Sequence, residues 1–172
     1  SATHAALPTA LPGHYEVRLH DDWPRRPHHL VARKSIDVVI FRCDSDEIEQ
    51  ALATAVARGV PVRALIAHTN RGGEARLRKL EQRLLAAGAI VSRSADDLLR
   101  YHAKFMIVDG RVMHLFGFNF TRQDIDRSRS FGISTMNAKS VGEAARLFEA
   151  DVTRQPFAPA RSNLVVSPEN AR

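Results

Sequence analysis

The chain has 172 residues and a net charge of +6, and 44% of its residues are hydrophobic. This length suits one domain with its own core, and the apolar fraction is that of a globular protein. The single cysteine, Cys43, excludes an internal disulfide and a thiolate metal cluster. The positive charge favours an anionic partner such as nucleic acid, phospholipid headgroups or another phosphate, although it can also serve solubility alone.

The first part of the sequence differs from its middle. We expect residues 1–30 to form a flexible arm with a short edge strand within 14–20, because this part is rich in proline and histidine and has no steady hydrophobic period. Its first residues lack the charged front and long apolar middle of a signal peptide. The sequence contains no run of about 18 apolar residues and therefore predicts no transmembrane helix. The chain is therefore expected to be soluble or peripheral to a membrane, and its compartment stays open.

Residues 31–156 predict one domain of alternating strands and helices. Short apolar runs indicate buried strands, and amphipathic stretches that end at glycines indicate helices. Asp44 with Glu47, and Ser140 with Glu143, form capping-box patterns at the first and last helices. The expected strands are 35–42, 60–67, 89–93, 102–109, 111–118 and 129–136, and the expected helices are 44–58, 74–87 and one that begins at residue 140.

This order predicts an α/β fold, in which a mixed β-sheet is flanked by helices on both faces. Asp109 and Gly110 indicate a two-residue hairpin turn. The register of such a turn puts Gly117 opposite His102 and puts Asn119 just beyond, at the same end of the hairpin.

His102 and Lys104 are costly to bury in a strand that otherwise consists mostly of Phe, Met, Ile and Val. Side chains alternate between the two faces of a strand, so these two project on the same side, with Cα atoms roughly 7 Å apart. With Asn119 at the same end, the three side chains converge in a way that suits a phosphodiester.

This set of side chains predicts a definite chemistry. A neutral imidazole can attack phosphorus and form a phosphohistidine, which divides one difficult step into two. Lys104 and Asn119 can hold the non-bridging oxygens and stabilise the charge of the transition state. No cluster of carboxylate ligands stands beside the histidine, so neither a metal nor another cofactor is expected. Each residue also has an ordinary structural explanation, and it is their joint spacing that favours a site.

The segment HAKFMIVD, residues 102–109, resembles the His-x-Lys-x4-Asp signature of the phospholipase D superfamily. Asn119 falls where that superfamily places the asparagine of its Gly-Ser-x-Asn continuation, while Phe116 and Gly117 replace the Gly and the Ser. The sequence before the motif is similar to the family pattern as well, so the resemblance covers about 33–155.

The resemblance implies a phosphodiesterase or phosphatidyltransferase with a phospholipase D-like α-β-α sandwich, in which two copies of the motif meet. One histidine is the nucleophile, and the other protonates the leaving oxygen and then activates water or an alcohol. By this resemblance His102 is one of that pair. Lys104, Asn119 and Gly117 contribute to phosphate binding, and Asp109 supports the histidines and the local structure.

The chain contains one motif, which leaves several interpretations open. It can be the first motif-bearing half of a two-motif enzyme resembling bacterial phospholipases D and cardiolipin synthases, with 157–172 as a linker or tail. It can also homodimerise, like the family's small bacterial endonucleases, and act on DNA or RNA. The apolar LVVS and the Ser-Pro turn of the tail favour the two-half interpretation and, with it, a phospholipid substrate. A third possibility is a phosphate-binding module without catalytic activity.

Overall fold

The computed structural model describes residues 15–16, 32–70, 72–160, 164–169 and 171. Its centre is one seven-stranded sheet in the order β1-β7-β6-β5-β2-β3-β4. The strands are β1 (Tyr15–Glu16), β2 (Ile36–Ile40), β3 (Val62–Ile66), β4 (Ile90–Arg93), β5 (Phe105–Val108), β6 (Val112–Phe116) and β7 (Gly132–Thr135). The helices are α1 (Asp46–Ala57), α2 (Glu74–Ala86), α3 (Arg122–Arg127) and α4 (Ala138–Thr153).

The sheet is mixed, as the sequence predicts. β2, β3 and β4 are parallel, whereas β5, β6, β7 and β1 each pair in antiparallel fashion. The two-residue β1 forms the edge strand beside β7. The rest of the arm expected over 1–30 lies outside the described residues, apart from this strand.

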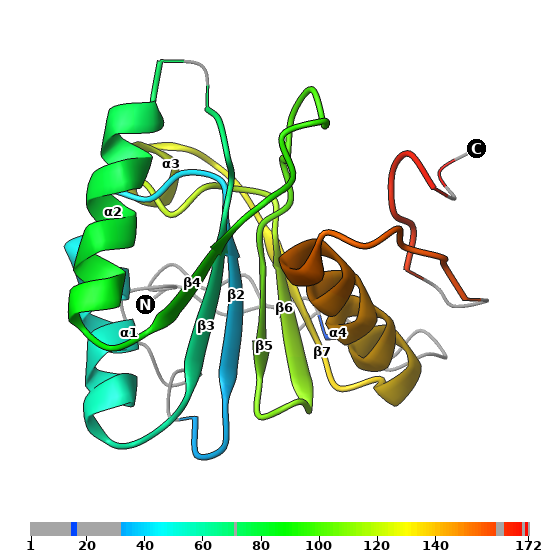
Figure 1. The fold of residues 1–172 in the computed structure, drawn as a ribbon. Helices are drawn as coiled ribbons and strands as arrows, with labels where there is room; N and C mark the ends of the chain where they lie inside the picture. Colours follow the sequence, from blue (N-terminus) through cyan, green and yellow to red (C-terminus); the bar gives the residue numbers. More distant parts are fainter. Residues whose placement is uncertain (1–14, 17–31, 71, 161–163, 170, 172) are drawn as a thin grey trace, which may run out of the picture.

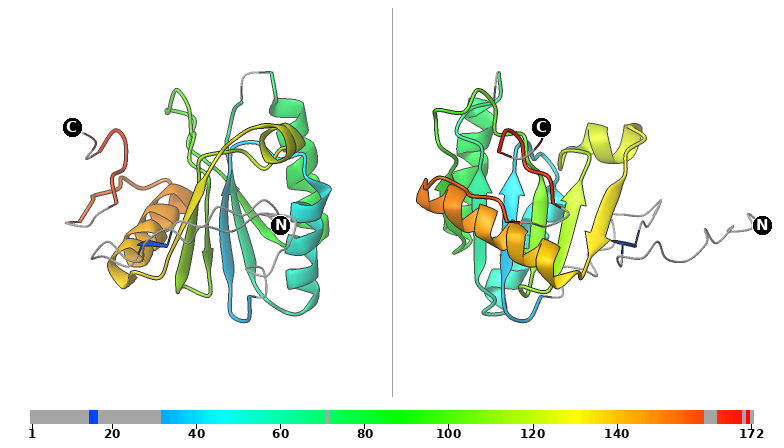
Figure 2. Two further views of the ribbon diagram at one scale, coloured as in Figure 1. Left: turned by 180° about the vertical axis from the view of Figure 1, so that it is seen from behind. Right: turned by 90° about the vertical axis from the view of Figure 1, so that its right-hand side faces the viewer.

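Helices cover both faces of the sheet, which confirms the predicted α/β architecture. In Figure 1, α1 and α2 lie on one side of the strands and α4 lies on the other, and the reverse view in Figure 2 shows the same three layers. α2 buries Leu77, Leu80 and Leu84, and α4 buries Val141 and Phe148. None of the helices in the described part of the chain is long and apolar enough to cross a membrane.

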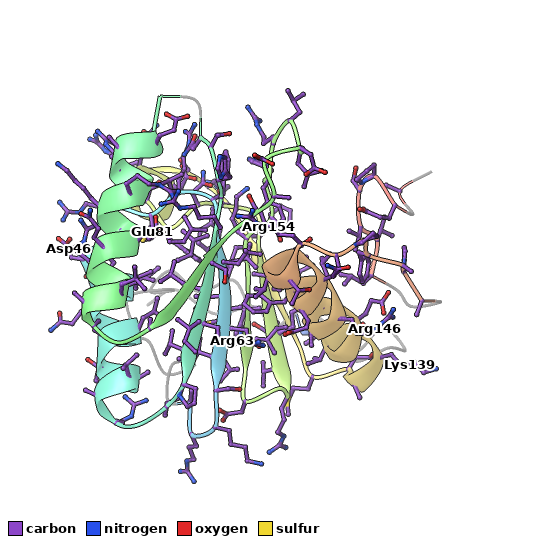
Figure 3. The ribbon with its side chains drawn as sticks, viewed as in Figure 1. Asp46, Arg63, Glu81, Lys139, Arg146 and Arg154 are labelled. Atoms are coloured by element: carbon purple, nitrogen blue, oxygen red, sulfur yellow. The ribbon has the colours of Figure 1, made fainter. Side chains whose placement is uncertain are left out.

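Arg63 joins the sheet to α4. Its guanidinium contacts Asp37 of β2 at 2.7 Å and Glu149 of α4 at 2.8 Å, and its Cζ lies 4.9 Å from the centre of the Phe148 ring. Figure 3 shows this side chain between the strands and α4. The contact fixes α4 on the sheet face opposite α1 and α2.

The first helix begins one residue later than predicted. Its cap is Ser45, whose hydroxyl accepts a hydrogen bond from the Ile48 N–H. The predicted cap at Asp44 is wrong because tertiary contacts occupy that residue. Its N–H donates to the Phe120 carbonyl at 3.0 Å, and its carboxylate accepts the Arg122 N–H at 2.7 Å.

The last helix begins earlier than predicted. Its cap is Asn137, whose side chain accepts the N–H of Ser140 at 3.1 Å. Asparagine caps helices as well as serine does, so the cap three residues upstream prevails over the predicted Ser140. Glu143 is therefore free for another contact: it is buried, pairs with Arg146 and accepts the N–H of Ala160 at 2.6 Å. Figure 3 shows Arg146 on α4. The guanidinium of Arg146 also donates to the Ala158 carbonyl.

The hairpin of β5 and β6 pairs Val108 with Val112, one residue away from the predicted register. Asp109 and Gly110 both have positive φ, and the Arg111 N–H donates to the Val108 carbonyl as a two-residue turn requires. Arg111 nevertheless has no partner in the pairing of β5 with β6, because Val108 faces Val112. Asp109 is held from outside the hairpin, since its N–H donates to the Ser35 carbonyl at 2.8 Å. Continuing the observed register places Phe118, rather than Gly117, opposite His102.

Candidate active site

His102 and Lys104 lie directly before β5 and not within it, so the strand predicted from residue 102 begins three residues later. The pairing with β6 still extends this far, because the Lys104 carbonyl accepts the Phe116 N–H at 2.9 Å. The Lys104 Nζ lies 3.1 Å from Nε2 and 3.3 Å from Nδ1 of His102. Lys104 is buried, whereas His102 is exposed. The structure therefore brings these two side chains together as predicted.

The buried ring of Phe41, which follows β2, packs against this pair. β2 and β5 are antiparallel neighbours, so the residues after β2 lie beside those before β5. The imidazole of His102 meets the Phe41 ring edge-on at 4.7 Å between ring centres, and the Lys104 Nζ lies 5.5 Å from its centre. Arg42 and Arg100 place their Cζ atoms at 5.3 Å and 5.9 Å from the same centre. Four basic side chains thus lie around one aromatic ring that directly follows β2.

Desolvation and the neighbouring cations together lower the pKa values of the pair. Burial lowers the pKa of His102, and the charges of Lys104, Arg100 and Arg42 lower it further. Burial also lowers the pKa of Lys104, with Arg100 and Arg42 acting in the same direction and Asp124 opposing them. An imidazole with a lowered pKa is mostly neutral near pH 7, which is the form that can act as a nucleophile.

Asn119 reaches the same end of the sheet on the segment that leads into α3. The next residue, Phe120, donates its N–H to the Arg42 carbonyl at 3.1 Å. The N–H and the Nδ2 of Asn119 both donate to one carboxylate oxygen of Asp124, at 2.9 Å and 2.8 Å. Its Oδ1 is buried without a hydrogen-bond partner among the described residues. Asp124, which acts electrostatically on Lys104, thus connects Asn119 to the pair.

The structure does not bring Asp109 to His102. Asp109 lies at the other end of β5, on the order of 20 Å away given the rise of a strand. Its Oδ1 accepts the backbone N–H groups of Arg33, Lys34 and Ser35 at 3.0, 2.7 and 3.1 Å. Although burial opposes ionisation, these three donors lower the pKa of Asp109 below its usual range. Within this chain the aspartate of the motif fastens the hairpin to the segment before β2.

Gly117 has a packing role. Its N–H donates to the Phe131 carbonyl at 3.0 Å, and a Cβ atom at this position would lie 2.9 Å from that oxygen. The close approach explains a glycine where the family pattern has serine. The role of Gly117 in phosphate binding stays a prediction.

Sequence analysis did not identify four residues of this end of the sheet as parts of the site. Phe41, Arg42, Arg100 and Asp124 come from three separate segments, and only the fold brings them together. A local signal for α3 was present, because Thr121 and Asp124 stand three residues apart in a capping pattern and the Thr121 hydroxyl accepts the Asp124 N–H. The charge of Arg42 and Arg100 is visible in the sequence, but their shared neighbour is not.

Comparisons with known proteins find matches to both the sequence and the fold of this chain. The family model for the cardiolipin synthase phospholipase D-like domain matches residues 30–152. Nuc from Salmonella typhimurium, a phospholipase D family member, superposes with a TM-score of 0.64 at 20% identity, covering 76% of this chain and 85% of that chain. NucT from Helicobacter pylori superposes with a TM-score of 0.59 at 16% identity, covering 81% and 94%.

A longer protein contains the same fold. Phosphatidylserine synthase from Haemophilus influenzae superposes with a TM-score of 0.52 at 16% identity, covering 76% of this chain but 34% of that chain. No curated protein matches the sequence significantly. At these identities the solved structures show a shared fold, whereas the family model covers well over half of the chain.

Proposed function

This chain belongs to the phospholipase D superfamily, and we propose that it is a metal-independent phosphodiesterase or phosphatidyltransferase that acts through a phosphohistidine. The observation that carries the proposal is the contact of 3.1 Å between the Lys104 Nζ and the His102 ring. The exposed imidazole can reach a substrate, and the buried ammonium beside it can neutralise a phosphate oxygen.

The reaction needs two histidines, and His102 supplies one of them. In the first step an imidazole nitrogen attacks phosphorus, a phosphorus–nitrogen bond forms, and the leaving oxygen takes a proton from the second histidine. In the second step water or an alcohol, deprotonated by that same histidine, attacks the phosphohistidine and releases the product. A second copy of the motif, from another copy of this chain or from a C-terminal half, provides the partner histidine.

The remaining motif residues take different roles. Lys104 and Asn119 bind the non-bridging oxygens, and Asp109 stabilises the fold around them from the far end of β5. A phosphate oxygen would replace part of the hydrogen bonding that Asp124 now provides to the Asn119 amide.

Phospholipids are the proposed substrates, because the family model that matches this chain describes a cardiolipin synthase domain. A homodimeric nuclease acting on DNA or RNA is the second candidate. The similarity to Nuc and NucT favours this second candidate. The match covers 85% of Nuc and 94% of NucT, so a chain of this size can make up nearly all of such a protein.

The test is hydrolysis of a chromogenic phosphodiester by this chain in EDTA, measured over a series of protein concentrations. Turnover whose specific rate rises as dimers form would show that two copies of this chain build the site, whereas no turnover from a folded chain would mean that a C-terminal half supplies the second motif. Release of a phospholipid headgroup from vesicles, compared with nicking of plasmid DNA under the same conditions, then assigns the substrate class. Turnover that EDTA abolishes would contradict the metal-independent mechanism.

A further inference from the structure

Arg42 and Arg100 add more positive charge to the site than a phosphodiester requires. Both side chains are exposed, and in the part of the chain that the structure describes neither lies within 4 Å of a carboxylate. By contrast, Arg63 and Arg83 are paired with acidic side chains. Like charges close together repel one another, so an unpaired group of this kind gains stability when an anion binds.

Arg42 is held in place by a buried side chain. Its Nε donates to the Oδ1 of Asn70 at 3.0 Å, and the Nδ2 of Asn70 donates to the carbonyl of Phe41 at 3.4 Å. Asn70 is only 5% exposed, and its own N–H donates to Glu74. The contact with Asn70 uses Nε and leaves the two terminal nitrogens of the guanidinium for a ligand, which is the arrangement that recognises a phosphate.

The charges do not balance with one phosphodiester. Lys104, Arg42 and Arg100 carry three positive charges, and the nearby Asp124, which accepts from Asn119, carries one negative charge. A phosphodiester carries a single negative charge, and the proposed reaction uses Lys104 and Asn119 for its two non-bridging oxygens. The two arginines are therefore left for a second anionic group next to the reacting one.

We infer that Arg42 and Arg100 bind a second phosphate of an anionic phospholipid substrate, beside the phosphodiester at His102 and Lys104. The inference deepens the proposed function and rests on it for the position of the reacting phosphate. The distances of 5.3 Å and 5.9 Å to a shared ring centre place both guanidinium groups next to the catalytic pair.

The surroundings of the arginines favour a lipid over a nucleic acid strand. Leu98 and Leu99 directly precede Arg100, and these side chains are 41% and 102% exposed. Apolar side chains beside a cation suit an amphiphilic ligand, whose acyl chains adjoin its anionic headgroup. The Phe41 ring is 4% exposed, so it is not available for stacking on a base.

Binding of inorganic phosphate and inorganic pyrophosphate to the full chain, measured by isothermal titration calorimetry, tests the second phosphate site without requiring turnover. We expect the wild-type chain to bind pyrophosphate at least about tenfold more tightly than phosphate, since one additional charge-assisted hydrogen bond already contributes about a factor of ten. The double variant Arg42→Ala, Arg100→Ala should lose this ratio and keep its affinity for phosphate. The matched control is the double variant Arg76→Ala, Arg111→Ala, which removes two exposed arginines from α2 and from the opposite end of the sheet.

A ratio that is absent in the wild-type chain, or that survives in the Arg42 and Arg100 variant, would overturn the inference. A chain that shows the expected ratios but whose turnover EDTA abolishes would contradict the proposed function alone. The substrate arm compares cardiolipin with phosphatidylglycerol in detergent micelles, and a 5′-phosphorylated dinucleotide with the mononucleotide. Tighter binding of cardiolipin that depends on the two arginines supports the lipid assignment. Tighter binding of the dinucleotide alone overturns it.

Discussion

The two ends of β5 carry the polar residues of a single motif and use them in opposite ways. At the end where the strand begins, His102 and Lys104 meet two further cations around Phe41 and leave an imidazole exposed. At the end where it stops, the Asp109 carboxylate is satisfied by three backbone N–H groups of 33–35. Figure 1 shows these two ends of β5 at the top and at the bottom of the sheet.

The difference separates reactive groups from supporting ones. At the first end Arg42 and Arg100 have no carboxylate within 4 Å among the described residues, and the pKa values of His102 and Lys104 are lowered, which together mark this end as a candidate functional site. A carboxylate whose acceptors are filled gives stability and has little capacity left for chemistry. Under the proposed function, one short motif therefore supplies a reactive pair at one end of β5 and a structural contact at the other, because the strand has only 4 residues.

The sharpest test of the reactive end is His102→Ala. We expect the rate of phosphodiester hydrolysis to fall at least about a thousandfold, because the variant lacks the group that attacks phosphorus or protonates the leaving oxygen. The free energy of unfolding should stay nearly constant, since the side chain is exposed. Hydrolysis of a chromogenic phosphodiester and urea denaturation measure the two quantities. Substantial residual turnover in a folded variant would remove His102 from the mechanism.

Lys104→Met tests the second member of the pair. We expect kcat/KM to fall roughly a hundredfold to a thousandfold, the loss typical of one charge-stabilising donor. Stability should not fall, because methionine fills a similar volume and removes a charge from a site that is 6% exposed. Steady-state kinetics and thermal unfolding check both statements. Nearly normal kcat/KM would show that Lys104 is a packing residue.

Asp109→Asn tests the supporting end. Asparagine tolerates the positive φ of 55° at this position but loses the charge that accepts the three N–H groups. We expect the free energy of unfolding to fall by about 1–2 kcal/mol at pH 7, with kcat changed far less than by His102→Ala. A loss of turnover comparable to that of His102→Ala at unchanged stability would contradict the separation of the two ends.

The same variant has a predicted pH dependence. The pKa of Asp109 is lower in the folded chain than in the unfolded one, so its stabilisation is fully present above the unfolded pKa and is lost as the pH falls through the folded pKa. The difference in stability between wild type and Asp109→Asn should therefore be largest near pH 7 and disappear in strong acid. Urea denaturation at several pH values measures it, and a difference that grows in acid would show that the assigned contacts are wrong.

Local patterns in the sequence were enough to predict the mixed sheet, the helices on both faces and the meeting of His102 with Lys104. They were not enough for features that depend on contacts distant in sequence. The hairpin register differs by one residue from the prediction, and segment 33–35 binds the turn residue Asp109 from outside the hairpin. Arg42 and Arg100 were missed as site residues because the pairing of β2 with β5 brings them to one ring. The hydrophobic periodicity around Arg42 or around Arg100 does not show that the two residues share a neighbour.

The smallest expected effect is a shift in pH dependence at the reactive end. After burial, the charges of Lys104, Arg100 and Arg42 contribute to the lowered pKa of His102. Removing one cation by Arg100→Gln lets the imidazole protonate more readily, so the pKa of His102 should rise. Because the imidazolium cannot attack phosphorus, the acidic limb of the kcat/KM profile should move to higher pH.

The matched variant Arg111→Gln removes an exposed arginine at the supporting end and should leave this limb in place. High salt should shrink the difference between the two variants, since it screens exposed charges. An acidic limb that moves equally in both variants would mean that the overall charge of the protein sets the pKa of His102. A shift confined to Arg100→Gln would instead show that the local cation cluster, present at one end of β5 and absent from the other, controls the protonation of His102.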